Sequence, residues 1–243
     1  MSKALVVIPT YNEIENIERL IRNVFSLQRN FEILVVDDNS PDLTSKKVEE
    51  LQKEFPEKLH LLLRAEKTGL GTAYIAGFKW ALARKYEFIF EMDADFSHNP
   101  NDLIRLYNAC EKQEYEVAIG SRYVKGVNVV NWPMSRVLMS WLASKYVRFV
   151  TRMPIFDTTA GFVCYRRKVL ETINLDKIQF VGYAFQIEMK FKAYLSKFSI
   201  IEIPVIFTDR TKGESKMSGG IISEAVFGVL SMKFKSLFNR YEI

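Results

Sequence analysis

The stretch ALVVIPTYNEIENIERLIRNVFSLQRNFEILVVDD, residues 4–38, decides the fold class. Apolar runs at residues 4–8 and 33–36 enclose a segment whose apolar residues recur at helical spacing. Short, continuously apolar strands joined by an amphipathic helix are typical of a parallel sheet that is covered on both faces. Asn12, followed three residues later by Glu15, resembles a capping box and predicts that the helix starts there.

The same alternation continues outward from this stretch to about residue 120. Further strands are expected at residues 59–63, 88–92 and 117–119, preceded in turn by helices at residues 44–55 and 71–84 and by a helix that starts at Asn99-Pro100. Repeated strand–helix units favour an α/β fold with a mostly parallel, Rossmann-like central sheet covered by helices.

Size and composition favour one domain. The chain has 243 residues, of which 48% are hydrophobic, and it contains no linker, repeat or low-complexity stretch, so a single domain over residues 1–243 is expected. The two cysteines, Cys110 and Cys164, are far apart and favour a reducing compartment over a disulfide framework. No apolar run approaches the ~18 residues of a membrane-spanning helix, so no transmembrane span is expected.

Charge is distributed unevenly along the chain, which carries a net charge of +5. Residues 1–121 contain 15 Lys and Arg against 20 Asp and Glu, whereas residues 122–243 contain 19 against 9. The two halves are therefore expected to serve different ligands. A basic half suits a phosphorylated substrate, an anionic membrane or nucleic acid. Nucleic acid is not expected, because no recognition motif is present and the acidic half opposes it.

Polar clusters follow three of the expected strands, at residues 9–13, 37–42 and 93–98. Ligands of parallel α/β sheets bind beyond the carboxyl ends of the strands, so these three clusters are expected to converge on one site.

The third cluster places Asp93 and Asp95 on either side of Ala94, directly after an apolar strand. Two such carboxylates ionise together most readily beside a cation, and oxygen ligands favour Mg²⁺ or Mn²⁺. An EF-hand is excluded, because His98 stands at its required glycine and Ile104 at its final glutamate. The histidines and cysteines lack zinc-ligand spacing. A chance surface pair of aspartates remains the alternative.

Other segments admit both a functional and a structural interpretation. Gly69 and Gly71 precede a helix, but Tyr74 stands at the third glycine of a dinucleotide-binding motif, so these glycines also suit close helix packing. The basic stretch at residues 209–216 suits phosphate binding or a solvated turn. Residues 137–156 and the C-terminal segment mix aromatic and basic residues, which suits core helices or amphipathic helices at a membrane interface.

Seven stretches in order along the chain carry a family resemblance: IPTYNE at 8–13, VDDNSPD at 36–42, GLGTAY at 69–74, DADFSHNP at 93–100, GSRY at 120–123, GF at 161–162 and RTKGESKM at 210–217. Together they resemble the polyprenyl-phosphate mannose synthases, including the dolichol-phosphate enzymes, within inverting glycosyltransferase family two.

The resemblance implies a GT-A fold, a GDP-mannose donor, a polyprenyl or dolichyl monophosphate acceptor, and Mg²⁺ or Mn²⁺. It implies that the nucleotide pocket is lined by Pro9, Tyr11, Glu13, Val36 and Asp38. It places the diphosphate and metal at Asp93, Ala94 and Asp95, and the phosphates of donor and acceptor at Arg122, Arg136, Ser140, Arg210 and Lys216. Asp95, Arg122 and Arg136 are the expected catalytic residues, with residues 1–121 serving donor and metal and residues 122–243 serving acceptor and membrane.

Two departures from the family pattern change the expectations. Some relatives carry Gln where Ser97 stands, so a metal contact from this position is expected only through water. Many relatives continue into transmembrane helices, so a peripheral protein on the cytoplasmic side of a membrane is expected, with amphipathic C-terminal helices or a separate membrane-spanning subunit as its anchor. The alternatives are a UDP-glucose donor and a non-catalytic nucleotide-sugar-binding or membrane-scaffold protein.

Overall fold

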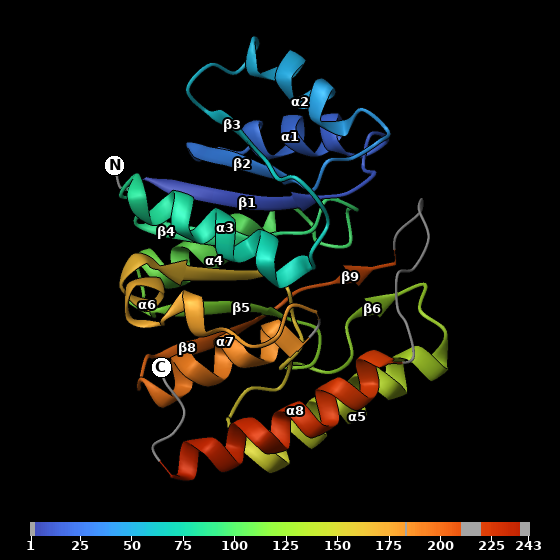
Figure 1. Cartoon of the computed structure of the whole chain (residues 1–243), viewed down its shortest axis with the longest axis vertical. Helices are drawn as coiled ribbons and strands as arrows, with labels where there is room; N and C mark the ends of the chain where they lie inside the picture. The colour runs from blue at the N-terminus through green and yellow to red at the C-terminus, as the bar shows by residue number, and fades with distance from the viewer. Residues whose placement is uncertain (1–2, 183, 210–219, 239–243) are drawn as a thin grey trace.

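The computed structural model describes residues 3–182, 184–209 and 220–238. A seven-stranded sheet of order β3-β2-β1-β4-β7-β5-β8 runs through the molecule (Figure 1). Its strands are β1 (Ala4–Thr10), β2 (Phe31–Asp37), β3 (Leu59–Leu63), β4 (Phe88–Glu91), β5 (Val117–Ser121), β7 (Val163–Arg166) and β8 (Ile200–Pro204).

The sheet is mostly parallel, as predicted. β1 pairs in parallel with β2 and β4, β2 with β3, and β5 with β8, whereas β7 is antiparallel to β4 and β5. Val163, the first residue of β7, pairs with Glu91 and Ile119 near the carboxyl ends of its neighbours. The segment before β7 therefore reaches the same sheet edge as the three polar clusters.

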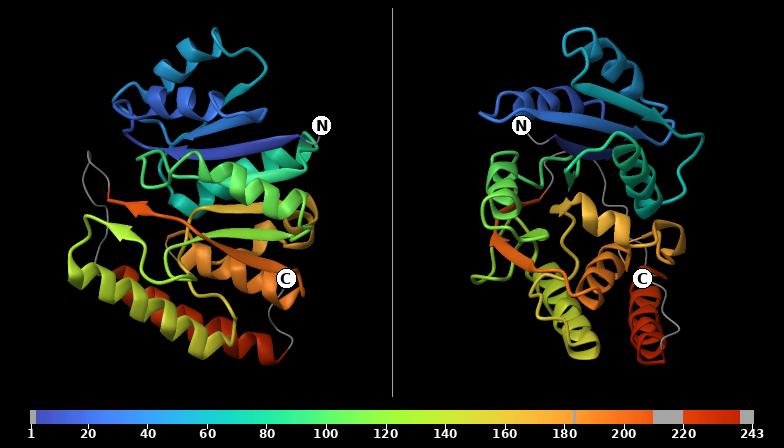
Figure 2. Two further views of the ribbon diagram at one scale, coloured as in Figure 1. Left: turned by 180° about the vertical axis from the view of Figure 1, so that it is seen from behind. Right: turned by 90° about the vertical axis from the view of Figure 1, so that its left-hand side faces the viewer.

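Helices cover both faces of the sheet (Figure 2). One buried apolar cluster lies under α1 (Ile17–Phe25), α2 (Thr44–Gln52) and α4 (Asp102–Glu111). The other lies under α3 (Leu70–Ala83), α6 (Arg167–Thr172) and α7 (Ala184–Leu195), with the short 3₁₀ turn at Leu175–Lys177. This arrangement confirms the predicted α/β layers.

The glycines of α3 serve close packing, which was one of their two interpretations. A Cβ at Gly77 would lie 2.4 Å from Val7 Cγ1, and one at Gly71 would lie 2.8 Å from the ring of Phe185. Gly69, just before the helix, has φ +119°, a conformation that side chains rarely adopt.

The expected capping box at Asn12 does not form, and α1 begins only at Ile17. Asn12 has φ 60°, and its N–H donates to Ser40 Oγ at 3.0 Å. The helix is started instead by the carbonyl of Glu13, which accepts from the N–H groups of Asn16 and Ile17. The prediction was wrong because contacts with a distant loop outweigh the local capping preference.

Two long helices, α5 (Met134–Thr151) and α8 (Gly220–Leu237), lie side by side below the sheet (Figure 1). The Tyr146 hydroxyl donates to the carbonyl of Val226 at 2.9 Å, and Val147 and Val229 attach the pair to the apolar core. Above the start of α5, β6 (Val129–Val130) pairs in parallel with β9 (Phe207–Thr208). Among the described residues, no helix combines the length and apolar character that crossing a bilayer requires.

Candidate functional site

The ends of β1 and β2 are joined by buried hydrogen bonds. The register pairs Pro9 with Val36, which brings these two expected nucleotide-pocket residues together. Asp37 is fully buried, and its Oδ2 accepts from Thr10 Oγ1 at 2.7 Å and from Ser40 Oγ at 2.6 Å. Asp37 therefore fixes the shape of its loop.

Residues 11–14 are held against the loop that follows β2. Three backbone N–H groups donate to side-chain oxygens of that loop, each at 3.0 Å: Asn12 to Ser40, Glu13 to Thr44 and Ile14 to Asp42. These bonds place Tyr11 and Glu13 at the same sheet edge as Asp38. The structure thus brings the five residues expected to line a nucleotide pocket to one edge of the sheet, where the Val36 side chain itself is fully buried in the core.

Two cations join this group. Arg64 Nη1 lies 3.1 Å from Asp38 Oδ1, and Lys67 Nζ lies 4.4 Å from the centroid of the Tyr11 ring. Burial raises the pKa of Asp38, while the positive charge of Arg64 opposes that rise. A carboxylate, an aromatic ring and two cations within one loop cluster can hydrogen-bond and stack a nucleotide.

Asp93, Ala94 and Asp95 follow β4 at the same edge. Both aspartates are half-buried, and Ala94 is buried between them. The Ser97 N–H donates to Asp95 Oδ1 at 3.0 Å, and the Tyr74 hydroxyl donates to Asp93 Oδ1 at 3.4 Å. Burial raises the pKa of Tyr74 well above its usual value, so its hydroxyl remains a donor.

His98 lies against the loop of Asp93 and Asp95. The Asp93 N–H donates to His98 Nδ1 at 3.2 Å, and the imidazole stacks on Phe162 with centroids 4.8 Å apart. Burial lowers the pKa of His98 to about 4. The ring is therefore neutral at physiological pH and acts as a hydrogen-bond acceptor within the fold.

The oxygen atoms of this loop fit a divalent cation whose coordination a substrate completes. Mg²⁺ and related ions are commonly bound by one or two carboxylates together with substrate phosphate oxygens and water. Asp93 and Asp95 offer that partial set. No group of three or more His, Cys, Asp or Glu able to enclose a metal occurs in the described part of the chain.

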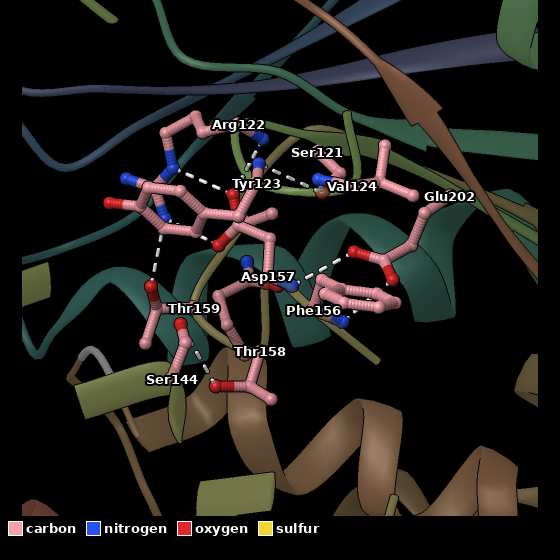
Figure 3. Close-up of polar contacts among 12 residues, drawn as sticks. Ser121, Arg122, Tyr123, Val124, Ser144, Phe156, Asp157, Thr158, Thr159 and Glu202 are labelled. Carbon is pink, nitrogen blue, oxygen red and sulfur yellow. Dashed lines mark hydrogen bonds and ion pairs between the residues drawn. The ribbon is translucent and has the colours of Figure 1, made fainter. Parts of the chain in front are cut away.

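Arg122, directly after β5, forms the centre of the basic side of the site (Figure 3). It is only 8% exposed. Its Nε and Nη2 donate to the two carboxylate oxygens of Asp157 at 2.7 and 2.6 Å, and Nη2 also donates to Thr159 Oγ1 at 2.8 Å. Burial works to raise the pKa of Asp157, but the Arg122 charge and hydrogen bonds hold it below its usual range. The contacts with Asp157 and Thr159 thus fix the orientation of the guanidinium.

The Asp157 loop is itself held by Glu202 on β8 (Figure 3). The Glu202 carboxylate accepts from the N–H groups of Phe156 and Asp157 at 2.6 and 2.8 Å. Asp157 also accepts from the backbone N–H of Arg122 at 2.9 Å. A continuous chain of hydrogen bonds therefore runs from the edge strand to the Arg122 guanidinium.

Trp132 lies near both Arg122 and Arg136, two of the three arginines expected to bind phosphate. Its ring centroid is 4.1 Å from the guanidinium of Arg136 and 5.5 Å from that of Arg122. Arg136 Nη1 forms an ion pair with Asp209 Oδ1 at 2.8 Å. The Trp132 indole N–H is buried and has no hydrogen-bond partner within the described ranges.

Ser140 lies one turn after Arg136 on α5 and faces the hydroxyl of Tyr123. Burial raises the pKa of Tyr123, whereas Arg122 and the Ser140 hydroxyl act to lower it. Arg122, Arg136 and Ser140 therefore gather around one patch. Arg210 and Lys216, the other expected phosphate ligands, lie outside the described residues.

Beneath the aspartate loop lies a buried polar network that the sequence did not reveal. Burial raises the pKa of Glu91 and lowers that of Lys190, each to about 8, while the attraction between the two opposes both shifts. Lys190 Nζ donates to the carbonyl of Ala160 at 2.6 Å and to that of Gln186 at 3.2 Å. The lysine thus anchors the segment before β7 to α7.

Sequence reasoning also missed Arg64, Trp132, Asp157 and Glu202. The usable signal for Asp157 was its place in a polar stretch, residues 157–161, that leads into the Gly161-Phe162 pair. Glu202 lies within an otherwise apolar strand, and Trp132 precedes a Pro at a helix start. Each of these patterns has a common structural explanation, so the pattern alone does not mark a site.

Comparison with known proteins agrees with this geometry. Residues 5–173 match the family model "Glycosyl transferase family 2". The chain belongs to this family. The match begins in β1 and ends just after α6, so it includes the loops of Asp38, Asp93 and Asp95, Arg122 and Asp157.

This family 2 chain is similar over nearly its whole length to curated mannosyltransferases. It is 45% identical to a polyprenol monophosphomannose synthase of Mycolicibacterium smegmatis, covering 98% of this chain and 89% of that protein. It is 44% identical to an undecaprenyl-phosphate mannosyltransferase of Micrococcus luteus, covering 93% and 92%. A dolichol-phosphate mannosyltransferase of Pyrococcus furiosus is 39% identical, and the chain spans 61% of its length.

Solved structures share the GT-A-like fold. A glucosyl-3-phosphoglycerate synthase of Mycobacterium tuberculosis, in complex with Mn²⁺, UDP and glucosyl-3-phosphoglycerate, matches with a TM-score of 0.67 at 14% identity, covering 100% of this chain and 81% of that one. A mannosyltransferase of Pyrobaculum calidifontis, in complex with GDP-mannose and Mn²⁺, matches with a TM-score of 0.63 at 20% identity, covering 98% and 64%. At such identities the likeness establishes the fold alone.

Proposed function

We propose that this protein transfers mannose from GDP-mannose to a polyprenyl monophosphate, with inversion at the anomeric carbon, to give polyprenyl-phosphate mannose. The observation that carries the proposal is the 45% identity, across 98% of the chain, to a polyprenol monophosphomannose synthase. The site supports it, because acidic loops suited to a nucleotide and cation face a basic patch suited to a phosphate.

The donor lies along the loops after β1, β2 and β4. Tyr11 and Asp38 contact the nucleoside, with Pro9, Glu13 and Val36 completing the pocket. Asp93 and Asp95 hold Mg²⁺ or Mn²⁺ together with the diphosphate. When bound, that ion neutralises charge on the departing diphosphate. Ser97 is only 3% exposed, which supports at most a contact through water.

The acceptor phosphate lies against the patch formed by Arg122, Arg136 and Ser140. Its oxygen is anionic at neutral pH, so no general base is needed to activate it. The arginines offset repulsion between acceptor and donor phosphates and aim the attacking oxygen at the anomeric carbon, opposite the leaving group. Asp157 already binds Nε and Nη2 of Arg122. In this proposal Arg122 therefore contacts the phosphate from one side only, and Arg136 contacts it from another. Arg210 and Lys216 complete the phosphate contacts in this proposal.

The lipid acceptor requires access to a membrane surface. Exposed apolar side chains occur along both α5 and α8, including Leu138 and Leu142 on the first and Phe227 and Phe234 on the second, the last two exposed by 72% and 63%. Such faces suit helices that lie in the interface of a bilayer. We place the protein peripherally on the cytoplasmic side, with a separate membrane-spanning subunit as a further possible anchor.

The test is transfer from GDP-mannose to a short polyprenyl phosphate with Mn²⁺, with Mg²⁺ and with EDTA, beside UDP-glucose as competing donor. We expect mannosyl-phosphate lipid only with metal, and a loss of at least about 100-fold in turnover for Asp95→Asn. Asp176→Asn removes an exposed carboxylate far from the site and serves as the control. Transfer from UDP-glucose instead would overturn the donor assignment, and donor binding without any transfer would favour a non-catalytic nucleotide-sugar-binding protein.

A further inference from the structure

The outward face of α5 changes from apolar to basic along its length. Met134, Leu138 and Leu142 are exposed by 70%, 51% and 56%. The same stripe continues, at helical spacings of three and four residues, through Lys145, Arg148, Phe149 and Arg152. The buried face of the helix carries Ser144, Val147 and Thr151.

An open pocket of about 520 Å³ lies over the last turns of this helix, lined by Lys145, Arg148, Phe149, Arg152, Met153 and Pro154. Phe149 is 71% exposed at its rim. Within the described ranges none of the three cations forms an ion pair with a carboxylate. They lie instead against aromatic rings: Lys145 Nζ is 3.7 Å from the Trp141 centroid, and the Arg148 guanidinium is 4.1 Å from that of Phe156.

The three cations contact aromatic rings, but no carboxylate in the described ranges neutralises their charge. Three neighbouring positive charges without a carboxylate repel one another, and the rings beneath Arg148 and Arg152, those of Phe156 and Phe149, are themselves exposed. A bound anion would reduce the repulsion between these charges. Because Phe149 is exposed at the rim, an anion that carries an apolar chain would also contact this ring. Basic side chains beside apolar and aromatic ones are typical of surfaces that bind anionic lipids.

We propose that this pocket binds the headgroup of an anionic phospholipid, so that α5 rests lengthwise on the bilayer. The inference rests on the proposed membrane association and adds a second, non-substrate lipid site. Arg148 follows Arg136 by 12 residues, which is about 18 Å along a helix. The headgroup site is therefore separate from the acceptor patch, and one helix contacts two lipid phosphates at its two ends. A helix held at both ends lies parallel to the membrane plane, which keeps the acceptor patch at the membrane surface.

The experiment is flotation of the full chain with vesicles of neutral phosphatidylcholine and with vesicles that also contain phosphatidylglycerol. A basic residue near an anionic surface contributes about 1 kcal/mol, which is about fivefold in partitioning. We expect Arg148→Gln with Arg152→Gln to weaken binding to the anionic vesicles about 25-fold and to leave binding to neutral vesicles unchanged. Lys53→Gln with Lys112→Gln removes the same charge from exposed positions elsewhere and should leave both unchanged.

Three outcomes would overturn the proposal. The first is equal loss in the Arg148/Arg152 and Lys53/Lys112 variants, which would reveal only a net-charge effect. The second is undiminished anionic-vesicle binding by the Arg148/Arg152 variant. The third is release by sodium phosphate well beyond that by sodium chloride of equal ionic strength, which would assign the pocket to a soluble phosphate. Transfer to a short acceptor in solution should persist in the Arg148/Arg152 variant, so failure here is distinct from failure of the proposed activity.

Discussion

Single side chains at the carboxyl edge of the sheet are mostly fixed by a partner of the opposite kind. Asp38 lies beside Arg64, Arg122 beside Asp157 and Arg136 beside Asp209. A group held in this way loses little conformational entropy when a ligand arrives, so its geometry is prepared in advance. The Trp132 indole N–H is different, because it is buried without a partner in the described part of the chain.

The unpartnered indole N–H leads to a prediction about acceptor binding. An unmet buried donor is costly, and a phosphate oxygen between Arg122 and Arg136 would satisfy it. Trp132→Phe keeps an aromatic surface for both guanidinium groups but removes the donor. We expect the Michaelis constant for polyprenyl phosphate to rise about tenfold, with that for GDP-mannose unchanged.

Trp80→Phe is the matched control for this measurement. Trp80 also packs against an arginine, with the Arg84 guanidinium 3.8 Å from its ring centroid, but it lies on α3 with its ring near Tyr86 and His60. Steady-state kinetics with both substrates distinguish the two variants. An unchanged acceptor constant in Trp132→Phe would remove the indole from the acceptor patch.

His98 leads to a prediction about stability and pH. The unfolded side chain takes up a proton near its usual pKa of 6.5 and the folded one only near 4. The unfolded state therefore binds more protons in this interval, so the free energy of unfolding falls as the pH is lowered through it. We expect His98 to contribute a loss of about 3 kcal/mol between pH 7 and pH 4.

Urea denaturation of the protein in EDTA at several pH values checks this expectation. His98→Asn keeps a side-chain acceptor for the Asp93 N–H and should flatten the slope between pH 6.5 and 4. An unaltered slope in His98→Asn would place the titration on other groups.

The sequence predicted many residues of the candidate site but not their partners. Asp93 and Asp95 were recognisable because they follow an apolar strand two residues apart. Asp157 and Glu202 were not, because the partner of a buried arginine is chosen by tertiary contacts across 35 and 45 residues or more of chain. A local sequence pattern therefore does not predict which distant residues will contact one another.

At the level of elements, the antiparallel β7 decides what the basic side of the site contains. Its reversed direction brings residues 157–161 to the carboxyl edge, where Asp157 meets Arg122. Glu202 on β8 then holds that segment through two consecutive backbone N–H groups. The position of the guanidinium thus depends on three elements that are distant in sequence.

This chain of contacts predicts that Glu202 is a positioning residue. Glu202→Gln leaves one carbonyl oxygen and turns an NH₂ group toward a backbone donor, so one hydrogen bond is lost. We expect turnover to fall about tenfold, corresponding to about 1.4 kcal/mol, with the affinity for GDP-mannose unchanged. Glu202→Asp, which retains both acceptors, should recover part of the loss.

Glu116→Gln separates positioning from stability. Glu116, the residue before β5, also accepts from the backbone N–H of Ser199 on a neighbouring segment, and it pairs with Lys168 far from the site. The Glu116→Gln variant should therefore have a lower melting temperature and unchanged turnover. Equal effects of the two Gln variants on turnover would show that Glu202 acts only through stability.

Element types were easier to predict than element boundaries. Continuous apolar runs marked β1, β2 and β4 because these strands are buried on both faces. The start of α1 was misplaced because Asn12 and Glu13 are drawn into hydrogen bonds with Ser40 and Thr44. The direction of β7 could not be predicted, since a four-residue strand carries no sign of parallel or antiparallel pairing.

At the level of the whole molecule, the acidic and basic halves of the sequence meet along one sheet edge. The loops of residues 1–121 contribute Asp38, Asp93 and Asp95, while residues 122–243 contribute Arg122 and Arg136. The charge asymmetry of the sequence is reflected in this candidate site, but Arg64 and Lys67 lie among the acidic loops, and Asp157 and Asp209 pair with the two arginines. The α5–α8 pair extends the basic half away from that edge, where sequence periodicity alone left core and interface interpretations open.

The Arg136–Asp209 ion pair has a consequence for turnover. A phosphate monoester acceptor carries up to two negative charges, whereas the mannosylated product, a phosphodiester, carries one. Asp209 competes for the same guanidinium throughout the cycle. The incoming dianion can displace this internal carboxylate, but the outgoing monoanion competes with it less well. We expect the enzyme to eject its own product, so that mannosyl lipid accumulating in the membrane inhibits it only weakly.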